Sequence, residues 1–236
     1  MSFSALVRMQ ELLIGGTETA ATTVEWAMAE MMTHPNVMKR AQDELYAVVG
    51  RDRLIQESDV PNLPFLQAVV KETFRFHAPT PLAVPRASSQ AAEAWGYTIP
   101  AGSQLLLNLR AIHRDPAFYT NPDEFDPQRF LDRPEVNHLS GFSFYELIPF
   151  GTGRRMCPGV NLGNTMVHLM LGNLVHNFDW SFPEDQSVET CQRENLEEVF
   201  GLTACRKEAL RLCAKPSDHI QSILQNTCSQ STQTRV

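Results

Sequence analysis

The chain of 236 residues has 20 Lys and Arg against 27 Asp and Glu, a formal net charge of −7, and without a long basic run this balance argues against a nucleic-acid partner. Its 43% of hydrophobic residues permits a sizeable core, yet it lacks an apolar run of the roughly 18 residues that would read as a membrane segment. The cysteine count of five is odd and includes no CxxC pair, which argues against a disulfide framework or a structural zinc site and favours reduced thiols.

The first predicted element is a long helix from about Ser4 to Thr33, where apolar residues recur at helical spacing. Pro35 ends it, because the residue before a proline disfavours helix. Gly15 and Gly16 lie within this helix and together cost roughly 2 kcal/mol relative to alanine. The pair therefore indicates either close approach by another group or a local distortion of the helix.

Further elements follow along the chain. Helices are predicted from Asn36 to Val49 and from Pro64 to about Phe76, and the prolines after residue 78 then exclude helix. The apolar segment Ser103–Leu109 predicts a buried strand, and residues 113–137 predict ordered loops and turns. A last helix is expected just after Gly159. The polar residues 217–236 predict a disordered tail, and residues 1–216 form the expected folded domain.

The segment Phe150-Gly-Thr-Gly-Arg-Arg-Met-Cys-Pro-Gly159 carries the strongest chemical signal. Cys157 stands at the start of the predicted helix, where the helix dipole and the nearby Arg154 and Arg155 favour a thiolate. Gly151 and Gly153 lack side chains, so the backbone can approach a flat ligand closely. A lone cysteine is more often a buried structural residue, and only the spacing of this segment decides against that reading.

This spacing, F-x-x-G-x-R-x-C-x-G, resembles the haem-binding signature of the cytochrome P450 family. The resemblance extends from about Leu12 to about Pro216, and the loop sequences are similar to those of plant microsomal members. It implies a mainly α fold with small β-sheets, the C-terminal half of the family's fold. It also implies that Cys157 is the axial ligand of a haem iron and that further residues of the loop contact the haem: Phe150, Gly151, Gly153, Arg155 and Gly159.

Two other motifs support the resemblance. Glu72 and Arg75 lie on one face of a predicted helix, as in the family's E-x-x-R pair. Arg129, in Pro127-Gln-Arg-Phe130, corresponds to the family's second arginine. The resemblance implies a buried structural network that holds the loop of Cys157, and arginine suits it better than lysine would. Arg86 aligns with an arginine that binds a haem propionate.

The resemblance also gives meaning to the glycine pair. It implies that Gly15 and Gly16 open a groove for dioxygen and that Glu18 and Thr19 are an acid–alcohol pair that delivers protons. Ala20 departs from the family pattern, which usually has a second hydroxyl there. A threonine-rich helix kink without chemistry is the alternative. The remaining residues of the implied substrate pocket are Leu82, Ala83, Val84, Gly201 and Leu202.

The implied activity is a monooxygenase that inserts one atom of O2 into a small apolar or aromatic substrate, such as a phenylpropanoid, flavonoid or terpenoid. Electrons would come from NADPH through NADPH-cytochrome P450 reductase at the cytosolic face of the endoplasmic reticulum. A haem-thiolate isomerase or dehydratase is an alternative, although such relatives often lack the acid–alcohol pair. Family members are about twice this length and begin with a membrane anchor, so an inactive, aggregation-prone fragment is the third reading.

Overall fold

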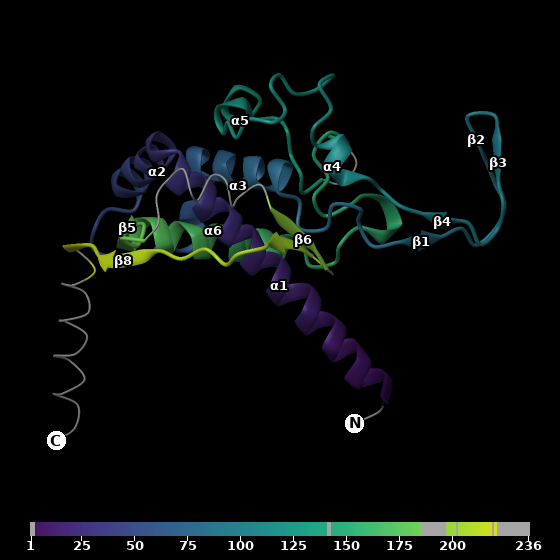
Figure 1. Cartoon of the computed structure of the whole chain (residues 1–236), viewed down its shortest axis with the longest axis horizontal. Helices are drawn as coiled ribbons and strands as arrows, with labels where there is room; N and C mark the ends of the chain where they lie inside the picture. The colour runs from purple at the N-terminus through teal and green to yellow at the C-terminus, as the bar shows by residue number, and fades with distance from the viewer. Residues whose placement is uncertain (1–2, 141–142, 186–196, 202, 219, 221–236) are drawn as a thin grey trace.

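The computed structural model describes residues 3–140, 143–185, 197–201, 203–218 and 220 (Figure 1). Within these ranges the fold is mainly helical with small sheets, as the sequence predicts. Four long α-helices pack together, and two short α-helices lie in the connection between the third and the last of them. The α-helices are α1 (Phe3–Thr33), α2 (Pro35–Val48), α3 (Pro64–Phe76), α4 (Leu109–Ile112), α5 (Gln128–Asp132) and α6 (Val160–Asn177), and the 3-10 helices are η1 (Glu57–Asn62) and η2 (Gly153–Arg155).

Prolines and glycines set the helix boundaries. Pro35 and Pro64 occupy the first turns of α2 and α3, where the missing N–H removes no helical hydrogen bond. Gly159 is the residue before α6. The four helices predicted from the sequence are therefore confirmed, with boundaries that differ by one or two residues. The α5 segment, predicted as loop, is instead a short helix.

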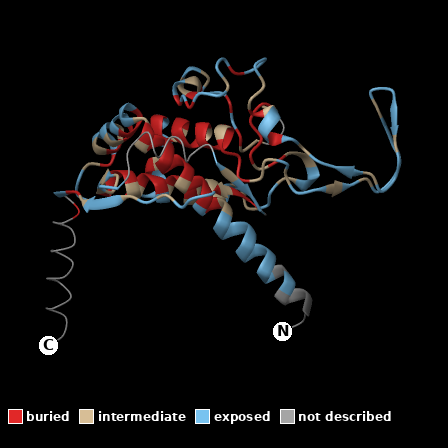
Figure 2. Ribbon diagram, viewed as in Figure 1, coloured by how far each residue is buried: buried red, intermediate tan, exposed pale blue. Residues whose placement is uncertain are grey.

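The core lies where α1, α2, α3 and α6 meet. Met31, Leu45, Leu66 and Leu171 are fully buried there, and each such side chain contributes about 1.5–3 kcal/mol by its removal from water. Close packing explains Gly172 of α6, since a Cβ atom there would lie only 2.8 Å from an atom of the Ile55 side chain. Figure 2 shows the buried residues concentrated in these helices, while residue 7 and residues 9–18 of α1 are exposed.

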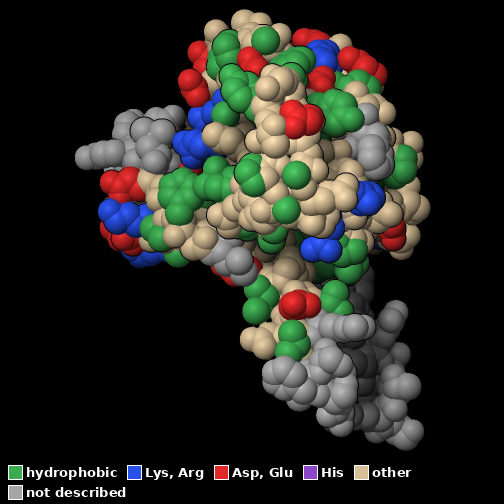
Figure 3. Space-filling model, turned by 90° about the vertical axis from the view of Figure 1, so that its right-hand side faces the viewer, with side chains coloured by type: hydrophobic (Ala, Val, Ile, Leu, Met, Phe, Trp, Pro, Cys, Tyr) green, Lys and Arg blue, Asp and Glu red, His purple; other side chains and the backbone are tan. Residues whose placement is uncertain are grey.

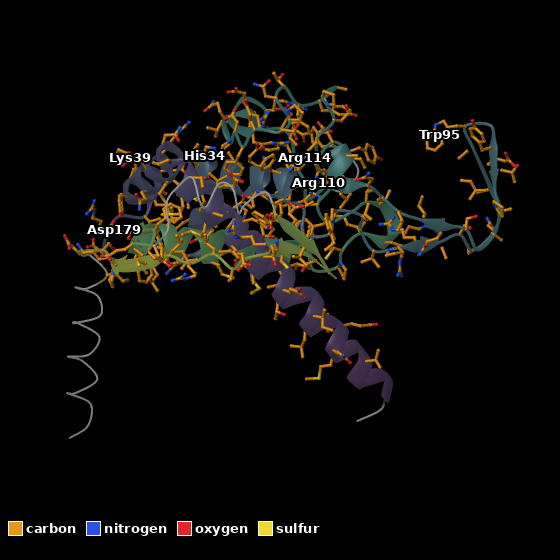
Figure 4. All side chains as sticks on the ribbon, viewed as in Figure 1. His34, Lys39, Trp95, Arg110, Arg114 and Asp179 are labelled. Atoms are coloured by element: carbon orange, nitrogen blue, oxygen red, sulfur yellow. The ribbon has the colours of Figure 1, made fainter. Side chains whose placement is uncertain are left out.

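The described strands form four antiparallel pairs. They are β1 (Arg86–Ala87) with β4 (Gln104–Leu105), β2 (Ala92–Ala94) with β3 (Tyr97–Ile99), β5 (Phe178–Ser181) with β8 (Cys213–Pro216), and β6 (Glu198–Phe200) with β7 (Ala204–Arg206). The β2–β3 hairpin projects from the body, with Trp95 at its tip (Figure 4). Trp95 and Gly96 both have positive φ, as a tight hairpin turn requires. Figure 3 views the molecule from the hairpin side, with α1 projecting below.

The segment Ser103–Leu109 is not the buried strand that its apolar residues predict. Only Gln104 and Leu105 pair with another strand, and Leu105 is 53% exposed because the two-stranded sheet has little packed against it. The Asn108 side chain accepts a hydrogen bond from the backbone N–H of Ala111 and thereby caps α4. The cap turns the chain into a helix at Leu109, so this leucine is buried from a helix rather than from a strand.

The glycine pair does not distort α1. The helix is continuous through Gly15 and Gly16, and no heavy atom outside the local helix lies within 4 Å of a Cβ atom built on either residue.

No helix in the described part of the chain has the length and apolarity needed to cross a membrane. At the C-terminal end, Ser217 is bonded to the backbone carbonyl of Asn177 through its N–H and its hydroxyl, so packing continues past Pro216. Residues 219 and 221–236 of the predicted tail lie outside the described residues.

Candidate functional site

The loop before α6 is closed by backbone hydrogen bonds and shaped by two glycines. The N–H of Cys157 donates to the carbonyl of Phe150 at 2.9 Å, and the N–H of Gly151 donates to the carbonyl of Ile148 at 2.9 Å. Gly151 and Gly153 have φ values of +73° and +75°, a region that costs other residues about 1–2 kcal/mol. Cys157 is exposed at the end of this loop, so its sulfur is available to a ligand.

Phe150 anchors the loop between two helices. Its ring packs edge-on against Phe74 of α3, with ring centroids 5.3 Å apart, and stacks near His138 at 6.1 Å. Gly163 of α6 lies on the other side, where a Cβ atom would be 3.5 Å from the Phe150 ring. These contacts fix the position of the loop relative to α3 and α6, and therefore the position of Cys157.

Two arginines give the loop a positive rim. The guanidinium of Arg86, in β1, lies 3.4–3.5 Å from the carbonyl oxygen of Thr152, and its Nη2 would be 3.3 Å from a Cβ atom on Gly151. The Arg86 Nη2 also lies 3.5 Å from the carbonyl oxygen of Arg155, whose own side chain is exposed on the same loop. Paired guanidinium groups suit carboxylates, because their planar N–H groups match two oxygens at once.

These residues fit a haem better than a metal ion held by protein side chains alone. No group of three or more His, Cys, Asp and Glu in the described ranges could hold a metal ion. A haem iron needs only an axial protein ligand, because the porphyrin supplies the other four donors. The exposed thiol of Cys157, the open space beside Gly153 and the two arginines at the rim together match a flat ligand that carries carboxylates.

A second cluster, the Glu72 network, consists of Glu72, Arg75 and Arg129. The Arg75 guanidinium donates to both carboxylate oxygens of Glu72, at 2.7 and 2.8 Å, and both side chains are completely buried. Arg129 donates through Nε at 3.0 Å, and the backbone N–H of Asp126 donates at 2.8 Å. One carboxylate thus receives four hydrogen bonds, three of them from two cations.

The network organises the loop between α4 and α5. Arg75 donates to the carbonyl oxygens of His113, Pro122 and Glu124 at 2.7–3.1 Å. Arg129 also donates to carbonyl oxygens of this loop, at 3.0–3.4 Å. These bonds satisfy backbone groups that have no partner in a helix or sheet, and they explain how a segment rich in proline and aspartate is ordered.

Glu18 and Thr19 lie in α1, before its buried half begins. The Thr19 hydroxyl donates to the carbonyl of Gly15 at 2.8 Å, so its oxygen can still accept a proton or a hydrogen bond. The Glu18 carboxylate accepts a hydrogen bond of 2.7 Å from the hydroxyl of Thr203, which is almost fully buried. Ala20, the departure from the family pattern, is a core residue at 4% exposure, which explains why a small apolar side chain stands there.

The two predicted pocket segments lie side by side. The N–H of Ala204 donates to the carbonyl of Pro79 at 2.8 Å, which joins the turn after β6 to the segment before Leu82. Leu82 and Val84 are 48% and 72% exposed, so apolar side chains are presented at this surface. Ala83, at φ +51°, packs against the cluster of Ala78, Leu109 and Ile148. Gly201 is exposed, and Leu202 lies outside the described residues.

Some residues of the site were not predicted from the sequence. Thr203 is the last residue of the predicted pocket turn, Phe200-Gly-Leu-Thr203, but only the structure shows that it contacts Glu18. His113 and Tyr119 are buried beside Arg75, and neither stands in a motif with an assigned role. The sequence places His113 at the start of the polar segment His113-Arg-Asp-Pro116, and nothing in such a segment indicates that the histidine is buried.

The comparison with protein families decides the identity. The family model described as Cytochrome P450 matches residues 5–212, most of the chain. The chain belongs to the cytochrome P450 family. The prediction of this family and of a part of its fold is confirmed.

Similar proteins give the extent of the match. A flavonoid 3'-monooxygenase of Crocosmia x crocosmiiflora is 48% identical over 207 residues, which cover 87% of this chain and 40% of that protein. A ferruginol synthase of Isodon rubescens is 44% identical over 204 residues, 86% of this chain and 40% of that one. A zebra fish cytochrome P450 solved with progesterone is 32% identical, with a TM-score of 0.77 over 87% of this chain and 45% of that chain. The chain therefore spans about two-fifths of the length of these curated relatives.

Proposed function

We propose that this chain carries much of a haem-thiolate monooxygenase site, in which Cys157 is the axial ligand of the iron. The observation that carries the proposal is the exposed thiol at the end of a loop that two left-handed glycines and the Cys157–Phe150 hydrogen bond hold in one shape. A haem with a thiolate ligand supplies the chemistry of dioxygen activation, because the sulfur donates electron density that favours O–O cleavage.

The neighbouring residues would bind and orient the haem. Arg86 and Arg155 are proposed to bind its propionates, since both arginines belong to the rim of the loop. Phe150, held against Phe74, is proposed to cover the sulfur and exclude water from it. Gly153 and Gly159 would leave room for the haem, because they have no side chains, and Gly151 allows the Arg86 guanidinium to lie against the backbone.

Glu18 and Thr19 are proposed to move protons. The Thr19 hydroxyl donates its only proton to the Gly15 carbonyl, so a relay would require the hydroxyl to turn from that carbonyl, give this proton on and receive another at its oxygen. Glu18 would bring protons from solvent, because its side chain is exposed and is held in place by the Thr203 hydroxyl. The open space beside Gly15 and Gly16 is proposed to admit dioxygen. A pair of this kind supports a monooxygenase more than an isomerase or dehydratase.

The names of the relatives refer to flavonoids and to ferruginol, and we propose a substrate of the same kind, a flavonoid, phenylpropanoid or terpenoid. The exposed apolar side chains of Leu82, Val84 and Phe200 would contact it. The electrons are proposed to come from NADPH through NADPH-cytochrome P450 reductase, at the cytosolic face of the endoplasmic reticulum, where that partner would meet the protein.

Oxygen-isotope labelling tests this proposal. The chain would be incubated with haem, NADPH, the reductase and either a flavonoid or a terpenoid, under heavy-isotope dioxygen. A chimera in which the preceding segment of the Crocosmia x crocosmiiflora flavonoid 3'-monooxygenase is joined to Phe3 would be assayed in parallel. We expect one labelled oxygen in the product of the chimera, at a rate near the enzymatic range of roughly 1 per second. Label-free product, or no product from either protein, would contradict the proposed activity.

A further inference from the structure

The Glu72 network and the Cys157 loop belong to different segments of the chain, and the residues just before the loop, Glu146–Ile148, run between them. Leu147 and Ile148 are buried at 0% and 4% exposure. Two buried residues from the connection after α4, His113 and Tyr119, are bonded to this segment through their side chains. Both also contact Arg75 of the Glu72 network, His113 through its backbone carbonyl and Tyr119 through its ring.

His113 makes the first connection. Its backbone carbonyl accepts a hydrogen bond of 3.1 Å from Arg75, and its ring Nε2 accepts one of 3.1 Å from the backbone N–H of Ile148. The residue has no exposed surface. Burial, together with the Arg75 guanidinium, lowers the pKa of His113 to about 3, so the ring is neutral and can accept at Nε2 at any physiological pH.

Tyr119 makes the second connection, two residues earlier in the segment. Its hydroxyl donates to the carbonyl oxygen of Glu146 at 3.0 Å, and its ring lies 5.1 Å from the Arg75 guanidinium carbon. Its side chain packs with Leu147 in one hydrophobic cluster. Burial raises the pKa of Tyr119, so the phenol keeps the proton that it donates.

The bonds continue from this segment to the sulfur-bearing residue. The carbonyl of Ile148 accepts from the N–H of Gly151, and the carbonyl of Phe150 accepts from the N–H of Cys157, both at 2.9 Å. Arg75, His113, Ile148, Gly151, Phe150 and Cys157 thus form one path of short contacts, in which each step fixes the orientation of the next peptide. A shift of the Ile148 peptide would turn the start of the glycine loop.

We propose that His113 and Tyr119 are positioning residues that transmit the rigidity of the Glu72 network to the Cys157 loop. His113 does so by accepting the N–H of Ile148, and Tyr119 does so by donating to Glu146. The effect on haem binding rests on the proposed function. The rigidity of the Cys157 loop is a property of the folded chain and can be measured without haem.

Hydrogen–deuterium exchange of the haem-free chain tests the proposal. In His113→Leu we expect exchange over residues 147–157 to accelerate about tenfold relative to α2, the factor that one lost hydrogen bond corresponds to. His113→Gln should restore most of the protection, because the amide oxygen can accept near the Nε2 position. Tyr119→Phe, which loses only the hydroxyl, should accelerate exchange over the same residues by a smaller factor, about threefold.

His176 supplies the matched control. It is also fully buried, and its Nε2 bonds to the carbonyl oxygen of Gly50 at 2.7 Å, at the far end of α6. His176→Leu should accelerate exchange near Gly50 and leave residues 147–157 unchanged. The proposal would be overturned if exchange over residues 147–157 accelerated equally in His113→Leu and His176→Leu, or if His113→Gln did not restore protection there. If His113→Leu does not fold, unchanged exchange over residues 147–157 in Tyr119→Phe overturns it.

A haem readout separates this inference from the proposed function. In the chimera, His113→Leu should increase the share of reduced, carbon monoxide-bound haem that lacks the thiolate-type absorption band, and His113→Gln should retain the band. Accelerated exchange in a protein that never shows this band would leave the positioning role standing and would remove the haem assignment. A normal band in His113→Leu, with accelerated exchange, would confine the role to the haem-free chain and contradict the transmission to Cys157.

Discussion

Replacement of Glu72 by alanine is the sharpest test of the network that supports the site. The variant removes the acceptor of four hydrogen bonds. It also leaves the Arg75 guanidinium without its counter-ion, and water cannot take the place of the carboxylate because the Arg75 side chain has no exposed surface. Removal of one partner from a buried ion pair costs about 3–5 kcal/mol. A whole domain is stable by about 5–15 kcal/mol, so Glu72→Ala should consume a large part of the free energy of unfolding.

The remaining bonds of Arg75 decide where in this range the loss falls. Its contacts with the carbonyl oxygens of His113, Pro122 and Glu124 persist in the variant and keep the cation partly solvated by protein dipoles. The loss should therefore be nearer 3 than 5 kcal/mol. Arg129→Ala should cost less than Glu72→Ala, because the Arg129 side chain is 12% exposed and Glu72 keeps its two bonds to Arg75.

Urea unfolding, followed by tryptophan fluorescence, measures the free energy directly, since Trp26, one of three tryptophans, is fully buried and becomes exposed when the chain unfolds. The double variant Glu72→Met with Arg75→Met provides the control, because it removes the fully buried pair together and leaves only the partly exposed Arg129 without its carboxylate partner. It should be destabilised by less than the sum of the two single variants. A Glu72→Ala variant within about 1 kcal/mol of the parent protein would refute the reasoning, because an exposed ion pair contributes that little.

Three further outcomes follow from the geometry. Gly151→Ala should lower the unfolding temperature and the haem affinity, since φ +73° costs a non-glycine residue about 1–2 kcal/mol and the new Cβ atom would lie 3.3 Å from Arg86. Gly163→Ala should be neutral or stabilising, because Gly163 lies in a helix and a Cβ atom there would make an ordinary contact with Phe150. Thr19→Ala should keep substrate binding in the chimera and divert NADPH electrons into peroxide; unchanged product per NADPH would contradict the relay. Burial lowers the pKa of His113 to about 3 and of His138 to about 4, so below pH 6.5 the unfolded chain binds protons that the folded chain does not. Stability should therefore be full above pH 6.5 and fall by about 1.4 kcal/mol per pH unit for each histidine towards pH 4, with a shallower fall in His113→Gln, as acid titration of the circular dichroism signal would show.

Local patterns made the long helices predictable, because helical spacing and proline positions act over neighbouring residues. The segment Ser103–Leu109 was predicted wrongly because its apolar character does not reveal how many strands lie beside it, and a single cap at Asn108 outweighs its strand propensity. Burial of Leu109 depends on contacts with Ala78 and Ile148, which are distant in sequence.

The candidate site divides along the same line. A fixed spacing around Cys157 and the Glu72–Arg75 pair could be found in the sequence, because each lies within one short segment. The contact between Glu18 and Thr203 joins residues 185 positions apart, and the bond between His113 and Ile148 joins residues 35 positions apart. The residues around a threonine or histidine do not indicate which distant residue it will bond to, so these two contacts could not be predicted from the sequence.

The absorption spectrum of the reduced, carbon monoxide-bound protein tests the assignment of Cys157 most directly. The chimera reconstituted with haem should show the red-shifted band of a thiolate-ligated iron, and Cys157→Ser should abolish it while the fold, measured by circular dichroism, is retained. Cys205→Ser and Cys213→Ser should leave the band unchanged, because they replace the other free cysteines of the described residues. A band that persists in Cys157→Ser would show that another residue binds the iron and would contradict the account of the loop given above.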